Sequence, residues 1–230
     1  MTPMNEFHHA FISARYFAHL KRAGTENYED IFLFALREYG SQRGRRMAQR
    51  ALRDGRPLDF ASYRYYGEWS FTGDFLSTAG TFFRETEKSE NYVYEVYDCP
   101  WNRVYQELGL PDGALLYCRD LDKAIARGFN PDLAYEVERF DNAPLLCRQM
   151  QFHALLEKGS AFPAKDPANQ KDFTYHCGHI LAVFRRVLWN CLGPAGDEIT
   201  SAVLSDFGER FGKAAADCLL AAAETDFDII

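Results

Sequence analysis

The stretch TFFRETEKSENYVYEVYDC (residues 81–99) changes the spacing of hydrophobic residues along the chain. In its second half, the residues of one face recur at every second position, at Tyr92, Tyr94 and Val96. This alternation is typical of a β-strand, and the polar residues 89–91 between the two halves favour a turn. The stretch therefore predicts two antiparallel strands joined by a tight turn.

A second pair of strands is expected downstream. LAYEVERF (133–140) and LLCRQMQFH (145–153) have strand-like composition and are separated by the turn residues DNAP (141–144). Between the two strand pairs, residues 100–109 and 112–128 have helical spacing. We expect an antiparallel sheet of about four strands, with helices between its two hairpins.

Both ends of the chain are predicted to be helical. Residues 5–24 and 28–52 carry apolar residues at helical spacing, and residues 173–193 and 197–223 do so near the other end. The glycines at 40 and 44 predict a kink, an end, or a close packing contact in the second helix. The predicted fold class is α+β, a sheet of about four strands flanked by N-terminal and C-terminal helices.

No linker or repeat divides the sequence. We expect a single domain over 1–230, with a helical N-terminal part (1–70), a sheet-containing core (80–155) and C-terminal helices (172–224). The polar segment 157–172 is interpreted as a lid or a border of the site.

The composition excludes several classes of protein. The net charge is -7 and 47% of residues are hydrophobic, which fits a folded soluble domain and argues against nucleic-acid binding. The basic cluster 41–56 is interpreted as the solvated face of a helix. Without an apolar run of membrane-spanning length or a signal-peptide pattern, we expect a cytoplasmic protein that does not contact membranes. A small-molecule substrate is the expected partner, and self-association is left open.

Cys118 lies in the apolar run LLYCRDLD (115–122). Helical spacing predicts that it points inward, on a face shared with Ala114, Leu115, Leu121 and Ile125. Asp122, four residues on, can reach the same region, whereas Asp120 is predicted to face solvent. The alternative is plain packing, because free cysteine is often buried.

Cys147 is predicted to share a strand face with Gln149, Gln151 and His153. This face is polar without being charged, which favours the floor of a polar cavity; an ordinary half-exposed strand is the alternative. His176 and His179 are three residues apart and share one helix face with Val183. This spacing differs from the HExxH zinc motif.

Segment 99–153 resembles the L-2-amino-thiazoline-4-carboxylic acid hydrolase family in the order of its short motifs. These motifs are Cys99, Glu107 with Gly109, Tyr117-Cys118 with Asp122, the turn GFNP at 128–131, and Cys147. The Gly-Arg-Gly pattern of Gly40, Arg43 and Gly44, FTYHCGHILAVF (173–184) and DFGERFG (206–212) extend the resemblance over residues 28–212. More distantly, the three cysteines resemble the plan of vinyl-reductase-type small-molecule-binding domains.

The resemblance implies a hydrolase acting on a C–N bond of a small cyclic amidine or related heterocycle. Opening of 2-aminothiazoline-4-carboxylate to an N-carbamoyl amino acid is the family's reaction. The alternative is a non-catalytic binding or sensor domain of the vinyl-reductase type.

Such chemistry needs a nucleophile, a proton shuttle and groups that hold the substrate. Cys118 or Cys147 is the candidate nucleophile, and His176 and Asp122 are candidates for the acid/base and for binding the amidinium. Arg43 and Arg148 are candidates for the substrate carboxylate, with His179 and Gln149 as further binding residues. In the alternative mechanism, Cys99, Cys118 and Cys147 are ligands of Zn²⁺, which activates water.

Overall fold

The computed structural model describes residues 3–78, 83–139, 146–155, 162 and 164–230. The α-helices, in chain order, are α1 (Glu6–Arg22), α2 (Tyr28–Arg53), α3 (Phe60–Tyr65), α4 (Gly73–Thr78), α5 (Pro100–Glu107), α6 (Pro111–Phe129), α7 (Phe173–Leu192), α8 (Pro194–Phe211) and α9 (Lys213–Ala223). The strands are β1 (Phe83–Lys88), β2 (Tyr92–Tyr97), β3 (Tyr135–Arg139) and β4 (Leu146–Gln151), and a 3₁₀ turn covers Pro167–Asn169. The predicted α+β class is confirmed, with α1–α4 before the sheet and α7–α9 after it in the sequence.

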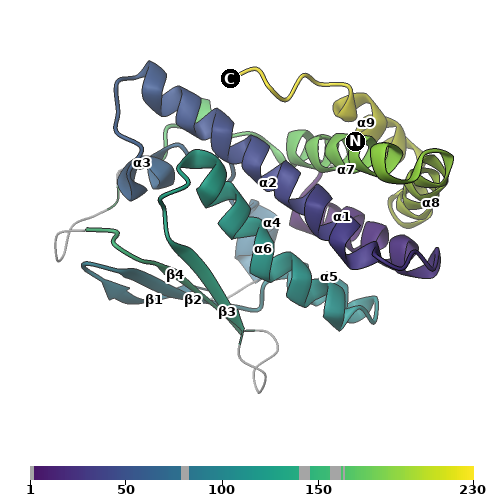
Figure 1. The fold of residues 1–230 in the computed structure, drawn as a ribbon, viewed down its shortest axis with the longest axis horizontal. Helices are drawn as coiled ribbons and strands as arrows, with labels where there is room; N and C mark the ends of the chain where they lie inside the picture. Colours follow the sequence, from purple (N-terminus) through teal and green to yellow (C-terminus); the bar gives the residue numbers. More distant parts are fainter. Residues whose placement is uncertain (1–2, 79–82, 140–145, 156–161, 163) are drawn as a thin grey trace. The chain divides into compact units, whose positions relative to one another are not determined.

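The four strands form one antiparallel sheet in the order β1-β2-β4-β3 (Figure 1). The last strand in the sequence, β4, therefore pairs with both β2 and β3. Its Gln149 lies opposite Tyr94 on one side and Val137 on the other. The predicted turn at 141–144 lies outside the described residues.

Local sequence explains where several helices begin. The Asn5 side chain accepts hydrogen bonds from the backbone N–H groups of Phe7 and His8 and so caps α1. Asp59 and Asp172 cap α3 and α7 in the same way. The predicted break at 193–196 is shorter than expected, because α8 begins at Pro194 immediately after Gly193. The short helix α4 was not predicted.

The described residues group into two compact units. Unit 1 contains 1–39, 100–117 and 172–227, and unit 2 contains 40–99, 118–171 and 228–230. The chain passes from one unit to the other within α2 and within α6. The single domain over 1–230 stays a prediction.

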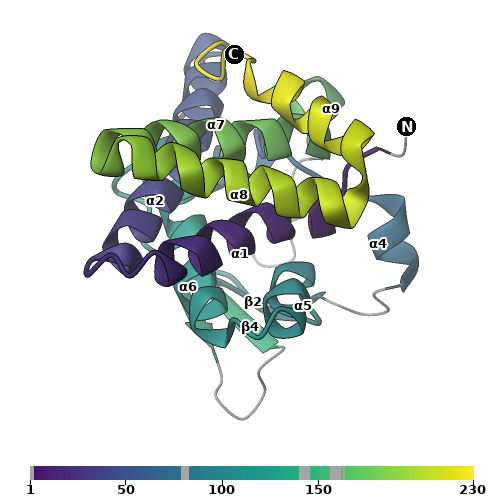
Figure 2. The same ribbon diagram turned by 90° about the vertical axis from the view of Figure 1, so that its right-hand side faces the viewer.

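Unit 1 is helical. In it, α1, α7, α8 and α9 pack against one another (Figure 2). Its interior is aromatic, with the rings of Tyr16 and Phe32 both in contact with Phe184. No helix in the described part of the chain is long and apolar enough to cross a membrane.

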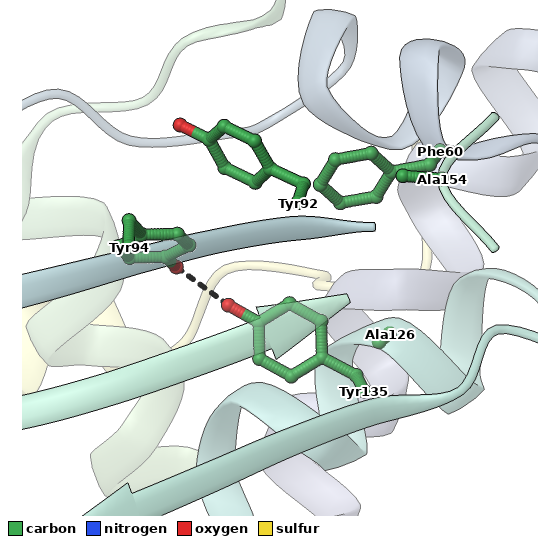
Figure 3. Close-up of a cluster of buried hydrophobic side chains, with 6 residues drawn as sticks. All are labelled: Phe60, Tyr92, Tyr94, Ala126, Tyr135 and Ala154. Atoms are coloured by element: carbon green, nitrogen blue, oxygen red, sulfur yellow. Dashed lines mark hydrogen bonds between the residues drawn. The ribbon is translucent and has the colours of Figure 1, made fainter. Parts of the chain in front are cut away.

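Unit 2 contains the sheet, with α3 and the second part of α6 packed on one of its faces. Their shared core is a cluster of buried side chains on this face: Phe60, Tyr92, Tyr94, Ala126, Tyr135 and Ala154 (Figure 3). The cluster contains three tyrosines, so its interior has hydroxyl groups that need hydrogen-bond partners.

The glycines of α2 are sites of close helix packing, one of the three predicted alternatives. The helix continues through both of them and lies against α6 (Figure 1). A Cβ atom added at Gly44 would lie 2.1 Å from the carbonyl oxygen of Ile125, and one added at Gly40 would lie 2.8 Å from the Cβ of Ala124. Gly128 of α6 fits equally closely against the backbone of Ser41.

Three predictions of side-chain exposure were wrong. The basic cluster is only partly a solvated face, because Arg43, Arg46 and Arg50 are all at most 3% exposed, whereas Arg45, Arg53 and Arg56 are exposed. On α6, Leu115 is 46% exposed and Asp120 only 8%, the reverse of the expected pattern. Helical spacing grouped Leu115 with buried residues and left Asp120 out of that group, because spacing alone does not show which neighbouring element covers each position.

Candidate functional site

Unit 2 contains a small, partly open pocket of about 110 Å³. Its charged lining residues come from α2, from α3 and the chain after it, from α6 and from the segment after 163: Arg43, Arg64, Glu68, Asp122 and Lys165. The sheet contributes Tyr94 and Tyr135, and α3 contributes Tyr63. The pocket therefore combines a hydroxyl-rich wall with charges of both signs.

Asp122 is connected to the sheet by hydrogen bonds. The amide of Gln149 on β4 donates from Nε2 to Asp122 Oδ2 over 3.0 Å. The other end of the same amide, Oε1, accepts hydrogen bonds from the hydroxyls of Tyr94 and Tyr135. These two hydroxyl oxygens lie 2.5 Å apart (Figure 3). The chain of polar groups fixes the carboxylate of Asp122 at the pocket wall.

The surroundings of Asp122 change its protonation. Burial raises its pKa to about 6, although the nearby Arg43 and the hydrogen bond from Gln149 both act in the opposite direction. Burial also raises the pKa values of Tyr94 and Tyr135 well above 10, so both hydroxyls stay protonated near neutral pH. Asp122 can therefore exchange a proton near neutral pH, and the two tyrosine hydroxyls keep the protons that they donate to Gln149.

Glu68 organises the basic side of the pocket. It accepts two hydrogen bonds from Arg46, of 3.0 and 2.7 Å, and one of 2.7 Å from Arg50. The Nε of Arg43 lies 3.8 Å from the same carboxylate, and its guanidinium lies 4.0 Å from the ring centre of Trp69. Burial alone would raise the pKa of Glu68, but the three arginines outweigh it and lower this pKa. The carboxylate is thus ionised, and its negative charge partly neutralises the three arginines around it.

The structure brings together some of the residues predicted from sequence. Arg43 and Asp122 line the pocket, and Gln149 binds Asp122 directly. Cys147 is on the same strand face as Gln149, whose Nε2 lies 3.8 Å from Sγ of Cys147. Cys118 is half-buried, and neither cysteine belongs to the described lining of the pocket.

Other predicted residues lie elsewhere. Arg148 is on the opposite face of β4 from Gln149 and pairs with Glu138 over 3.3 Å. His153 lies beyond the end of β4 with a φ of 52° and an exposed side chain, so it does not share the strand face predicted for it. Within the described residues, no group of three or more His, Cys, Asp or Glu side chains could hold a metal ion. Cys99, Cys118 and Cys147 thus form no such group.

His176 and His179 belong to unit 1. Both are fully buried in α7, and His179 stacks on the ring of Phe227 and lies against Tyr39. His176 contacts the rings of Phe173 and Tyr175. Their predicted roles in acid/base chemistry and in substrate binding stay predictions.

Sequence reasoning missed most of the pocket lining. Arg64, Glu68 and Lys165 lie on segments that carry no recognisable motif, and the tyrosines fit ordinary strand residues. One signal was present, because Arg43, Arg46 and Arg50 recur at helical spacing and so share one face. Three arginines on one face require acidic partners if that face is buried.

The fold is α+β, and its pocket combines tyrosine hydroxyls with charges of both signs. The chain belongs to the L-2-amino-thiazoline-4-carboxylic acid hydrolase family, whose pattern matches residues 4–141, more than half of the sequence. This result confirms the resemblance noted in the sequence. No curated protein and no solved structure matches the chain.

The family match covers only part of the residues in and next to the pocket. It includes Arg43, Glu68 and Asp122 but ends before Gln149 and Lys165. The segments 173–184 and 206–212 also lie beyond it.

Proposed function

We propose that the protein is a hydrolase that adds water to the amidine carbon of a small cyclic amidine bearing a carboxylate. The representative substrate is 2-aminothiazoline-4-carboxylate, which the family description names as a substrate. The observation that carries the proposal is Asp122, a carboxylate with a pKa raised to about 6 that lines a small, partly open pocket. A carboxylate of this kind is suited to general acid–base catalysis near neutral pH.

In the proposed reaction, Asp122 accepts a proton from water while the water oxygen bonds to the carbon of the protonated amidine. The resulting adduct is neutral and holds the hydroxyl, both nitrogens and the ring sulfur on one carbon. When it collapses, the carbonyl forms and the carbon–sulfur bond breaks. The sulfur takes the proton from Asp122, and the hydroxyl proton is released to solvent through the same carboxylate. The product is an N-carbamoyl amino acid with a free thiol.

The expected C–N hydrolase activity follows from the same chemistry on a different ring. In a thiazoline both nitrogens stay in the product, so the bond that breaks is C–S. A cyclic guanidine, in which nitrogen takes the place of the sulfur, would lose a C–N bond. Proton transfer by Asp122 is suited to opening either the sulfur-containing or the nitrogen-containing ring.

Water activated by Asp122 is the mechanism that the pocket favours over a nucleophilic cysteine. Asp122 lines the pocket, whereas the described lining includes neither Cys118 nor Cys147. Cys147 is nevertheless close to the Gln149 amide, so its replacement tests the cysteine alternative directly.

The test compares Asp122→Asn, Cys118→Ser and Cys147→Ser, with Asp132→Asn at an exposed position as the control. Turnover of 2-aminothiazoline-4-carboxylate is followed by mass spectrometry of the carbamoyl product. We expect Asp122→Asn to lose about 10²–10⁴-fold in kcat, the usual contribution of a general base, and the other three variants to keep their activity.

Loss of activity in either cysteine variant, with Asp122→Asn active, would replace this mechanism by thiol catalysis. Tight binding of the amidine by the parent protein without turnover would favour the non-catalytic sensor.

A further inference from the structure

The charges that line the pocket do not balance. Its cations are Arg43, Arg64 and Lys165, and its anions are Glu68 and Asp122. Glu68 is already bound by Arg46 and Arg50, two further arginines behind the pocket wall. The pocket and its immediate surroundings therefore carry an excess of positive charge, even when Asp122 is ionised.

Two of the lining cations have no acidic partner among the residues that the structure describes. The guanidinium of Arg64 lies over two aromatic rings, 5.6 Å from the centre of Tyr92 and 4.9 Å from that of Phe162. The ammonium of Lys165 donates a hydrogen bond of 2.9 Å to the backbone carbonyl of Trp69. Arg43, by contrast, has Glu68 beside it.

The side chain of Lys165 packs closely against the backbone at Gly67. A Cβ atom added at Gly67 would lie 3.2 Å from both Cε and Nζ of Lys165. The segment that follows is fixed to the same stretch of chain, because the backbone N–H of Lys171 donates to the Glu68 carbonyl over 2.7 Å. The hydroxyl of Ser70 also donates to Gln170 over 2.7 Å. The ammonium of Lys165 is therefore held in a fixed position in the pocket wall.

The lining cations act on one another. Burial, together with the charges of Arg64 and Arg43, lowers the pKa of Lys165 to about 8. The charged neighbour that acts on Asp122 is Arg43. A bound anion next to Arg64 and Lys165 would relieve their mutual repulsion, whereas a cation would be attracted to Asp122.

We propose that Arg64 and Lys165 bind the carboxylate of the substrate, while its amidine faces Asp122. The pocket would thus select small molecules with a cationic and an anionic group at opposite ends. This assignment rests on the proposed function and replaces Arg43 and Arg148 as the carboxylate-binding residues. Arg43 already has Glu68 and Trp69, and Arg148 pairs with Glu138 on the other face of β4.

The test measures binding by isothermal titration calorimetry with two aromatic analogues whose rings resist addition of water. One is 2-aminothiazole-4-carboxylate and the other is 2-aminothiazole, which lacks the carboxylate. We expect Arg64→Gln and Lys165→Gln each to weaken binding of the carboxylate analogue by about 10- to 100-fold, the usual effect of losing one charge-assisted hydrogen bond. Binding of 2-aminothiazole should stay within threefold of the parent protein.

Arg148→Gln is the matched control, and we expect it to change neither affinity. Lys165→Arg keeps the charge and should retain most of the preference for the carboxylate analogue. Circular dichroism and the melting temperature show whether each variant is folded. If Lys165→Gln does not fold, Lys165→Arg and Arg64→Gln still decide the question.

Equal losses for both analogues in the Arg64 and Lys165 variants would overturn the subsite, as would loss of the preference in Arg148→Gln. The subsite and the reaction can fail separately. Preference for the carboxylate analogue without turnover of the thiazoline supports the subsite and removes the proposed reaction. Turnover with an unchanged preference in both variants removes the subsite and leaves the reaction.

Discussion

At the scale of single residues, Asp122 is buried, which disfavours its charged form, and yet its neighbours favour that charged form. It is held in place by Gln149 and placed next to Arg43, both of which favour the ionised form. Burial outweighs them and leaves the pKa near 6. A carboxylate with these properties makes the folded protein less stable when it is ionised, which is a common cost of a catalytic acid or base.

The first prediction concerns the stability of Asp122→Asn as a function of pH. The folded pKa of Asp122, about 6, lies above its ordinary value of 3.8. Its contribution to stability is therefore fully present below about pH 4 and is lost as the pH rises through 6. The asparagine variant lacks this loss, so at pH 7.5 it should be more stable than the parent protein by about 1–3 kcal/mol.

Urea unfolding at pH 4 and at pH 7.5 measures the difference. The gain should shrink toward pH 4, where the aspartate is protonated in the folded parent protein. A variant that is equally destabilised at both pH values would show that Asp122 has no raised pKa. Asp132→Asn, at an exposed position, serves again as the control.

Residue patterns predicted part of the candidate site and missed the rest for a physical reason. Asp122 and Gln149 could be named because each lies on a helix or strand whose period defines a face. Lys165 could not, because its position depends on a contact with Gly67 nearly a hundred residues earlier in the chain. The burial of Arg46 likewise depends on Glu68, which no local pattern connects to it.

At the scale of elements, the contact between α2 and α6 depends on glycines. Gly40 and Gly44 of α2 and Gly128 of α6 allow the two backbones to approach more closely than any side chain would permit. This approach fixes the position of Arg43, on α2, relative to Asp122, on α6. The geometry of the pocket therefore depends on residues that do not touch it.

The second prediction is that Gly44→Ala destabilises the protein, although alanine is the better helix former. The new Cβ would lie 2.1 Å from the Ile125 carbonyl oxygen and 2.5 Å from the Phe129 nitrogen, so backbone must move. We expect a loss of about 2 kcal/mol or more, as for other overpacked interiors, with a marked loss of turnover.

Gly208→Ala in α8 is the control, because its Cβ would meet Ala216 at an ordinary 3.6 Å. It should stabilise the protein by up to about 1 kcal/mol. Thermal unfolding of both variants gives the comparison. Equal effects at the two positions would show that the α2–α6 contact is not tight.

The elements themselves were largely predictable, but their arrangement was not. The alternation that starts at Tyr92 located β2, although the strand ends at Tyr97 and not at Cys99, and Pro100 marked the start of α5. Nothing in these patterns shows that β4, rather than β3, pairs with β2. Strand order depends on how the strands fit against the rest of the fold. The sequences of β3 and β4 are both compatible with pairing to β2.

At the scale of the whole molecule, the two units are not consecutive segments of the chain. The path enters unit 2 within α2, returns to unit 1 for α5, and enters unit 2 again within α6. Neither unit can therefore be excised as one continuous piece. The sheet also depends on its last strand, because β4 is the partner of both β2 and β3.

The third prediction follows for a fragment of residues 1–141, which ends where the family match ends. It lacks β4, so β3 loses its partner and β2 loses one of its two. We expect no cooperative unfolding transition and no binding of 2-aminothiazole-4-carboxylate. Removal of Ile229 and Ile230, both exposed, should leave the melting temperature unchanged. A fragment that unfolds cooperatively would contradict the central role of β4.

The strand order also has a consequence during synthesis on the ribosome. The β1–β2 hairpin emerges before β4, and at about 5–20 residues per second the delay is on the order of seconds. In that interval, the edge of β2 that later receives β4 is open, and it presents Tyr92, Val93 and Tyr94. An isolated hairpin is marginally stable, and an open apolar edge can pair with another nascent chain. The charged strand β1 covers only one edge of β2. We therefore expect nascent chains that are crowded on one messenger to aggregate through the other edge of β2.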